Sequence, residues 1–140
     1  MITRLSAEET TEILARGRIG RLGCIDDRGP YVVPVSYIFR GDAIFAHSLN
    51  GRKISALRAD PRTCMQVDEI KDDFHWRSAI AFGSYEEVKG PDERKSVLDE
   101  LFVRYRNLTP IEAVPPDKNG PEDVVVFKIN VESVSGVGEP

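Results

Sequence analysis

The sequence predicts a mainly β fold, a six-stranded antiparallel β-barrel with helices at its periphery. Six segments have the residue pattern of strands, and short turns join most of them, which favours hairpins over βαβ units. A chain of 140 residues has room for one hydrophobic core. A sheet of this size in so short a chain tends to close, because closure removes its exposed edges. We therefore expect a single domain over residues 1–140.

The clearest predicted strand covers residues 31–40, where every odd-numbered residue from 31 to 39 is apolar or aromatic. This alternation places one face of the strand on the core. Pro34 lies inside the strand and cannot donate a ladder hydrogen bond, so we expect an edge strand or a local gap in pairing there. The other predicted strands are residues 18–25, 43–48, 63–70, 77–88 and 124–131.

Three helices are expected. Ser6 and Glu9 have the spacing of a capping box, and the helix they begin should end near Gly17. A short helix over residues 52–59 stops before an Asp-Pro pair. A third helix follows the Gly-Pro pair at 90–91, and its apolar stripe consists of Val97, Leu98, Leu101, Phe102 and Tyr105.

Residues 109–122 contain four prolines and are predicted to form a loop that could act as a lid.

Composition excludes several classes of function. The formal charge of −4 argues against a nucleic-acid partner. No apolar run approaches the roughly 20 residues that cross a membrane, and the polar, acidic N-terminus is unlike a secretory signal, so we expect a cytoplasmic protein with no membrane partner. Cys24 and Cys64 lack metal-ligand spacing, and we expect buried free thiols rather than a disulfide, a nucleophile or a metal site.

The first candidate binding site in the sequence is the segment His47-Ser48-Leu49-Asn50-Gly51-Arg52-Lys53. A strand ends there, and Arg52 and Lys53 occupy the first turn of the next helix. Positive charge at that position opposes the helix macrodipole. A bound anion would reverse this penalty, because backbone N–H groups, dipole and side chains would then act together. A solvated basic pair is the alternative that this segment leaves open.

Two further features have both a structural and a functional interpretation. Trp76-Arg77-Ser78 begins a strand, where Arg77 and Ser78 could contact phosphate oxygens or simply lie on the surface. His47 shares a strand face with Phe45 by alternation, so it is either a core histidine or a site residue.

In their order, four motifs resemble the pyridoxamine 5′-phosphate oxidase-related split-barrel family, in particular its nitroimidazole-resistance-protein-like branch. These are Gly20-Arg21-Leu22, Pro34-Val35-Ser36-Tyr37, the segment from His47 to Lys53, and Ser78 with Gly83. The resemblance covers residues 12–88, and residues 124–131 fit the last barrel strand. It implies an FMN-binding split barrel and a homodimer with FMN at the subunit interface.

The resemblance also implies roles for individual residues. Arg52 and Lys53 would hold the FMN phosphate, with Arg77 and Ser78 completing the clamp. The isoalloxazine ring would lie along the strand that contains Pro34, and Trp76 would lie over the flavin or at the dimer edge. His47 is the candidate catalytic residue. The implied cofactor site is Pro34, Val35, Ser36, His47, Ser48, Arg52, Lys53, Trp76, Arg77 and Ser78.

The function implied is an oxidoreductase that passes electrons from a reduced pyridine nucleotide through FMN to a small acceptor, such as a nitroaromatic or a quinone. True pyridoxamine phosphate oxidases carry an arginine-containing C-terminal signature, which residues 133–140 lack, so vitamin B6 oxidation is not expected.

Two alternatives remain at the level of sequence. The first is a non-catalytic barrel that binds flavin or haem, or the deazaflavin F420 in a groove containing Arg16, Arg18 and Arg21. The second is a structural dimer without a ligand.

Overall fold

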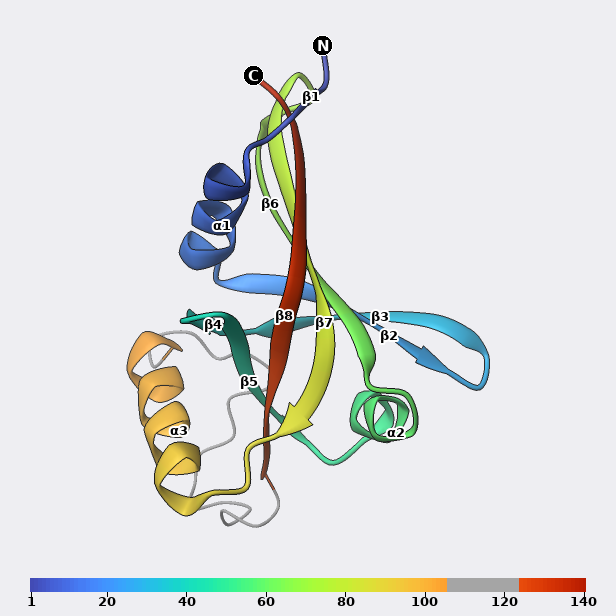
Figure 1. Cartoon of the computed structure of the whole chain (residues 1–140), viewed down its shortest axis with the longest axis vertical. Helices are drawn as coiled ribbons and strands as arrows, with labels where there is room; N and C mark the ends of the chain where they lie inside the picture. The colour runs from blue at the N-terminus through green and yellow to red at the C-terminus, as the bar shows by residue number, and fades with distance from the viewer. Residues whose placement is uncertain (106–123) are drawn as a thin grey trace.

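The computed structural model describes residues 1–105 and 124–140. The strands within these residues form one antiparallel sheet (Figure 1). The predicted loop over residues 109–122 lies outside these residues. The strands are β1 (Thr3–Arg4), β2 (Ile19–Asp26), β3 (Gly29–Ser36), β4 (Ile38–Arg40), β5 (Ala43–Leu49), β6 (Arg62–Asp72), β7 (His75–Glu87) and β8 (Val124–Glu139). The helices are α1 (Ala7–Arg16), α2 (Arg52–Ala59) and α3 (Pro91–Tyr105). None of these helices is long and apolar enough to cross a membrane.

The order of the strands shows how the sheet becomes a barrel. It runs β3-β2-β6-β7-β8-β5-β4, and β1 adds to β8. Strands β3 and β4 stand at opposite ends of this order, although only Tyr37 separates them in sequence. The sheet must therefore curl until its two ends meet at Tyr37, with the helices outside it (Figure 1). The predicted mainly β split barrel with peripheral helices is confirmed.

The structure differs from the prediction in the number and length of its strands. Within residues 1–105 and 124–140 the sheet has eight strands rather than six, because β1 is added and the segment predicted as one strand over 31–40 is divided at Tyr37. Strand β8 also runs eight residues beyond its predicted end at Val131, as far as Glu139. The Ser- and Gly-containing tail has no strong strand pattern, but it pairs with β7 along its length. Long-range pairing extends this strand where local propensity would end it.

The buried apolar residues form two clusters. The first fills the barrel and includes Leu22, Met65 and Phe127. The second lies between α3 and the outer side of β5, with Phe45 and Leu101 as members. Each fully buried side chain of this size contributes roughly 1.5–3 kcal/mol. The predicted core face of residues 31–40 is confirmed, since all five of its residues lie in or against the first cluster: Tyr31, Val33, Val35, Tyr37 and Phe39.

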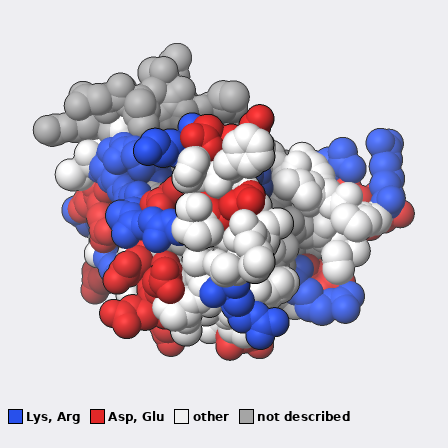
Figure 2. Space-filling view, turned by 90° about the horizontal axis from the view of Figure 1, so that it is seen from above, with Lys and Arg blue, Asp and Glu red and all other residues white. Residues whose placement is uncertain are grey.

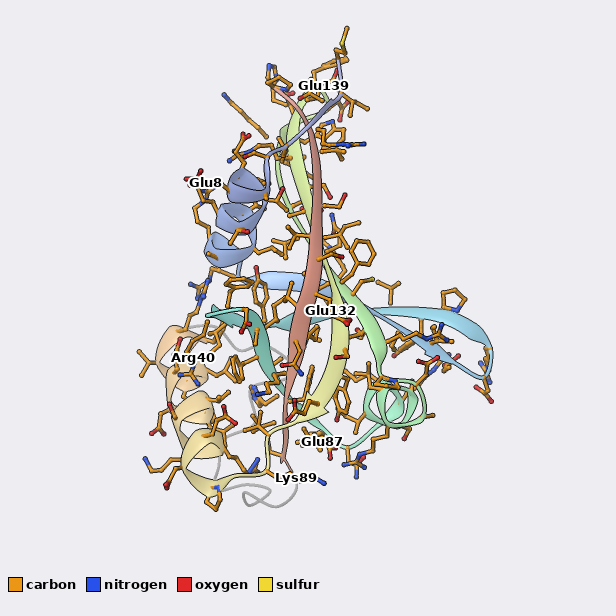
Figure 3. The ribbon with its side chains drawn as sticks, viewed as in Figure 1. Glu8, Arg40, Glu87, Lys89, Glu132 and Glu139 are labelled. Atoms are coloured by element: carbon orange, nitrogen blue, oxygen red, sulfur yellow. The ribbon has the colours of Figure 1, made fainter. Side chains whose placement is uncertain are left out.

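Two tyrosines attach the helices to the point where the sheet closes. The Tyr37 hydroxyl donates to the Leu14 carbonyl of α1 at 2.5 Å. The Tyr105 hydroxyl of α3 donates to the Arg18 carbonyl at 2.7 Å, contacts the Tyr37 carbonyl, and accepts the Tyr37 N–H at 3.1 Å. Burial raises the pKa of both phenols, so both hydroxyls keep their protons at neutral pH. Arg40 of β4 makes a further contact with α3, a 3.0 Å ion pair with Glu100 (Figure 3).

We expect Tyr105→Phe to lower the free energy of unfolding by about 1–3 kcal/mol, because it removes the hydroxyl that bonds the Arg18 and Tyr37 backbone. Urea unfolding followed by circular dichroism measures this loss. Val103→Thr is the control, since Val103 lies on the same helix and is 69% exposed, and its effect should stay within about 0.5 kcal/mol. Equal stability of the two variants would show that the hydroxyl does not attach α3 to the barrel.

Candidate functional site

A buried lysine lies at one end of the barrel, where β5 passes into α2. Lys53 is 8% exposed and Ser48 is 2% exposed. The Lys53 ammonium donates to the Ser48 hydroxyl at 2.6 Å. Burying an ammonium costs free energy that only hydrogen bonds and charges can offset. The fold therefore places a cation and a hydroxyl side by side in a protected position, which is the chemistry that binds a phosphate oxygen.

The N-terminus of α2 strengthens the positive potential at this position. Gly51 caps the helix without a side-chain hydrogen bond, and the first turn contains no acidic residue. The first N–H groups of the helix and the positive end of its dipole lie beside the two basic side chains of that turn. The Ser48 hydroxyl, which accepts from Lys53, donates to the Leu49 carbonyl at 2.7 Å. The two cations and the helix N-terminus fit an anion with several acceptor oxygens, as a phosphate monoester has.

Arg52 lies at the rim of this site, and its contacts are with Asp26 of β2 and Tyr31 of β3. Its guanidinium makes a 2.6 Å ion pair with Asp26 at the end of β2 and lies 4.1 Å from the centre of the Tyr31 ring. The Arg28 backbone N–H and the Arg52 guanidinium lower the pKa of Asp26. Arg52 therefore points toward the β2–β3 turn, whereas Lys53 points to the barrel.

Neither Asp26 nor Tyr31 was among the predicted site residues. Asp26 has the sequence signal of a turn residue, and Tyr31 that of a core strand. No local pattern connects either of them with Arg52, since 26 positions separate Asp26 from it. Only the packing of α2 against β2 brings them together.

His47 leaves β5 on the face opposite to Ser48. Its neighbours by alternation, Ala43 and Phe45, belong to the cluster under α3, whereas Ile44 and Ala46 belong to the barrel core. The His47 ring is buried and its centroid is 6.1 Å from that of Phe102 on α3. The structure thus groups the His47 side chain with α3 rather than with Lys53, and its predicted role at a cofactor stays a prediction.

The Pro34 strand is at an edge, as predicted. β3 ends the strand order and pairs only with β2 within the described residues. Pro34 is exposed, whereas Val35 and Ser36 are buried. The Val35 side chain belongs to the barrel core, and its backbone pairs with Gly20 of β2, so Pro34 and Ser36 are the residues whose backbone faces the open edge.

Trp76, Arg77 and Ser78 lie in the β6–β7 hairpin, far from Lys53 within one chain. Arg77 makes a 2.5 Å ion pair with Glu69, and the Ser78 hydroxyl accepts a 3.0 Å hydrogen bond from Gln66. The hairpin extends to the end of the molecule that carries both termini, whereas α2 lies toward the other end (Figure 1).

The strand register shows how far Ser78 lies from Asp26, the residue that holds Arg52. The β6 residue Gln66 pairs with Arg21 of β2 and lies close to Ser78. Asp26, which holds Arg52, is five residues further along β2, or about 17 Å at the usual rise of a strand. One chain therefore does not bring Arg77 and Ser78 to the predicted phosphate clamp.

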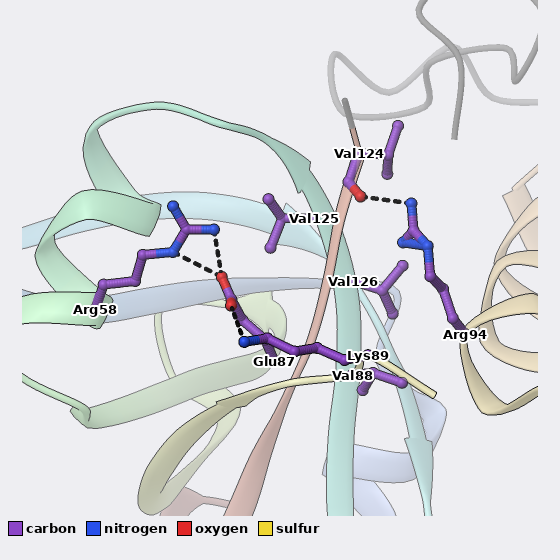
Figure 4. Close-up of a pocket in the computed structure, with 8 residues that line it drawn as sticks. All are labelled: Arg58, Glu87, Val88, Lys89, Arg94, Val124, Val125 and Val126. Atoms are coloured by element: carbon purple, nitrogen blue, oxygen red, sulfur yellow. Dashed lines mark hydrogen bonds and ion pairs between the residues drawn. The ribbon is translucent and has the colours of Figure 1, made fainter. Parts of the chain in front are cut away.

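A second hollow, of about 330 Å³, lies beside β8 and contains several charges that the sequence analysis did not single out (Figure 4). Arg58 makes a 2.6 Å ion pair with Glu87, and Lys89 lies 3.8 Å from the same carboxylate. Arg94 donates to the Val124 carbonyl at 2.7 Å. Since Glu87 offsets much of the positive charge here, this hollow is less suited to an anion than the Lys53 site.

Comparisons with known proteins identify relatives of the whole chain. An uncharacterised protein from Rhizobium meliloti (strain 1021) is 33% identical over 138 residues, covering 94% of this chain and 91% of the relative. A crystal structure from Mesorhizobium loti, described as an FAD-binding protein, is 34% identical with a TM-score of 0.84, covering 100% of this chain and 99% of that chain. A candidate 5-nitroimidazole antibiotic resistance protein from Bacteroides thetaiotaomicron shares the fold, with 21% identity, a TM-score of 0.77, and coverage of 99% and 87%.

The fold and these neighbours define the chain as a split β-barrel of the flavin-binding type. The sequence profile of the pyridoxamine 5′-phosphate oxidase family matches residues 6–137. The chain belongs to this family, and the resemblance carried by its motifs is confirmed.

Proposed function

We propose that the protein binds a flavin nucleotide, with FMN as the expected cofactor, and holds its phosphate at Ser48 and Lys53. The observation that carries this proposal is the buried ammonium of Lys53, 2.6 Å from the Ser48 hydroxyl, at the N-terminus of α2. The likeness to the Mesorhizobium loti protein, which is described as FAD-binding, supports a flavin as the ligand.

The residues present fit this ligand. Lys53 and the first N–H groups of α2 are donors that a phosphate dianion accepts, and the Ser48 hydroxyl would donate to it in place of the Leu49 carbonyl. Arg52 at the rim would add a second cation. The open edge of β3 at Pro34–Ser36 would present backbone groups to the flavin ring, since no described strand occupies that edge.

The bound flavin would supply the redox chemistry, with a reduced pyridine nucleotide as the donor and a nitroaromatic or quinone-like compound as the acceptor. The protein's part is to bind and orient the flavin and to keep water from one side of it. The barrel core behind Val35 would form an apolar wall for this purpose.

We further propose a homodimer formed through the outer face of β2, β3, β6 and β7. One cross-strand row on this face consists of Val32, Gly23, Cys64 and Phe82. Val32 is 65% exposed and Phe82 is 43% exposed, and the row contains no charged residue. An exposed apolar row of this kind is typical of a protein–protein interface.

A dimer would also explain why one chain keeps Arg77 and Ser78 far from Lys53. Its symmetry would bring the partner's Trp76, the partner's Arg77 and the partner's Ser78 to the Lys53 end of the first subunit. Uncharged side chains occupy much of the middle of the surface at the hairpin end of the molecule (Figure 2). Phe74 and Ile70 of the hairpin are 70% and 68% exposed, so this end has apolar surface for such a contact.

The parent protein should show a visible flavin spectrum after reconstitution with FMN, and Lys53→Met should bind FMN about 10–100-fold more weakly. The reason is the loss of a charge-assisted hydrogen bond, worth about 1.5–3 kcal/mol. Titration calorimetry measures the affinity, and circular dichroism checks the fold. FMN at 100 times its Kd should stabilise the parent by about 2.7 kcal/mol.

Lys95→Met is the matched control, because Lys95 is an exposed lysine on α3 and should leave FMN affinity unchanged. A parent protein that stays colourless and gains no stability from FMN would overturn the flavin proposal. An equal loss of affinity in both variants would overturn the role of Lys53.

Phe82→Asp should convert the dimer to a monomer and abolish most FMN binding, because it buries a charge in the proposed interface. Light scattering gives the oligomeric state and calorimetry the affinity. Val103→Asp, at an exposed position on α3, should change neither. A Phe82→Asp protein that stays dimeric would contradict this interface, and a monomer with full FMN affinity would contradict a cofactor shared between subunits.

The flavin-loaded protein should oxidise NADH or NADPH when a nitroaromatic or a quinone is present, and absorbance at the nicotinamide band follows the reaction. The flavin-loaded Lys95→Met protein serves as the control and should have the parental rate. Flavin bound without turnover with either acceptor class would leave a non-catalytic flavin-binding protein as the function.

A further inference from the structure

A network of polar side chains crosses the outer face of β2, β6 and β7 and ends at the Ser78 hydroxyl. Arg21 of β2 makes a 3.2 Å ion pair with Asp68 of β6. The Gln66 side-chain amide, also on β6, donates to Asp68 at 3.0 Å and to the Ser78 hydroxyl of β7 at 3.0 Å. The Gln66 amide therefore connects a charged pair on two strands with a hydroxyl on the third.

The Asp68 carboxylate determines which way this amide faces. An ionised carboxylate only accepts hydrogen bonds, so the NH₂ group of Gln66, and not its oxygen, must lie against it. The second N–H of that group then points at Ser78, whose oxygen accepts it. The Ser78 proton is thus directed away from Gln66, and no residue among 1–105 and 124–140 accepts it.

This network lies on the face that we propose as the dimer interface. Ser78 and Phe82 are four residues apart on β7, and β7 pairs with β6 in one register between them, so their side chains point to the same side of the sheet. Gln66 and Cys64 are two residues apart on β6 and share that side as well. The network therefore borders the apolar row that contains Cys64 and Phe82.

Association through this face would remove water from the Ser78 hydroxyl, whose proton would then need a new acceptor. A buried hydroxyl without an acceptor costs free energy. Neither Asp68 nor Gln66 accepts this proton in the structure. A phosphate oxygen suits it, because the proposed dimer brings Ser78 to the phosphate bound at the partner's Lys53.

We infer that Gln66 is a positioning residue for the flavin phosphate: its amide, oriented by Asp68, directs the Ser78 hydroxyl to donate to that phosphate. The inference rests on the flavin site and the dimer proposed above. It adds that Gln66 itself contacts no ligand and that its effect on binding passes through Ser78. The effect is therefore confined to ligands that carry a phosphate.

The affinities of the apoprotein for FMN and for riboflavin, which lacks the phosphate, test the inference by titration calorimetry. We expect Ser78→Ala to weaken FMN binding about tenfold, because it removes a hydrogen bond to a charged group. Gln66→Leu should weaken FMN binding about three- to tenfold, because the hydroxyl is then free to turn away from the phosphate. Neither variant should change riboflavin affinity by more than about twofold.

A double variant gives a second test, which needs only FMN. If Gln66 acts through Ser78, adding Gln66→Leu to Ser78→Ala should weaken FMN binding by less than about twofold more. Asn130→Leu is the matched control, since the Asn130 amide donates to the Glu86 carboxylate at 2.9 Å on the same sheet, and it should change neither affinity. Circular dichroism and light scattering check that each variant keeps the parental fold and oligomeric state.

The outcomes separate this inference from the flavin proposal. If FMN does not bind the parent, the flavin site is wrong and Gln66 loses its role with it. If FMN binds the parent and either Ser78→Ala or Gln66→Leu has parental FMN affinity, the positioning role is overturned, although the flavin site stands. Equal losses of FMN and riboflavin affinity in Gln66→Leu, or losses that add in the double variant, would show a packing role and overturn the inference in the same way.

Discussion

The closure of the sheet at Tyr37 is the constraint on which the rest of the molecule depends. One residue joins the two ends of the strand order, and it is fully buried. Its hydroxyl attaches to α1 and its amide to Tyr105 of α3, so both helices meet the chain where it changes from one end of the sheet to the other. With the ends joined there, β3 keeps an open edge and β5 delivers Ser48 to the start of α2. Both parts of the candidate site follow from this single connection.

Electrostatics distinguish the two basic neighbours in the first turn of α2. Successive helical residues point about 100° apart, so Lys53 enters the barrel end while Arg52 remains at the surface. The buried ammonium has little freedom and is screened less by salt than an exposed charge, whereas the Arg52 guanidinium is half-exposed and pairs with Asp26, whose side chain is 9% exposed. Lys53 is thus the buried part of the site and Arg52 its rim. A phosphate that took Arg52 away from Asp26 would leave a largely buried carboxylate unpaired, so Arg52 would meet a phosphate while keeping that partner.

Local patterns predicted the elements well, because each depends on neighbours along the chain. The capping box of Ser6 and Glu9 is present, α2 has its predicted bounds, and the alternation from Tyr31 to Phe39 identified a core face. What the sequence could not predict depends on residues far apart. The tail of β8 becomes a strand because β7 pairs with it, and Arg52 turns aside because Asp26 lies there. The predicted clamp of Arg52, Lys53, Arg77 and Ser78 combined residues that one chain keeps at different ends, since spacing along a sequence does not measure distance in a curled sheet.

The separation of the predicted clamp has a thermodynamic consequence. If both halves contact one flavin, they come from two subunits, and each bound cofactor then adds contacts across the interface. Ligand binding and association become linked, so flavin would tighten the dimer by the factor by which the dimer tightens flavin. The exposed row from Val32 to Phe82 offers little apolar area, because a glycine and a thiol lie between its two large side chains. An interface of that composition gains most from a shared ligand, since a planar ring buried between two subunits supplies the apolar area that the row lacks. On this view a bound cofactor would be part of what holds the two barrels together.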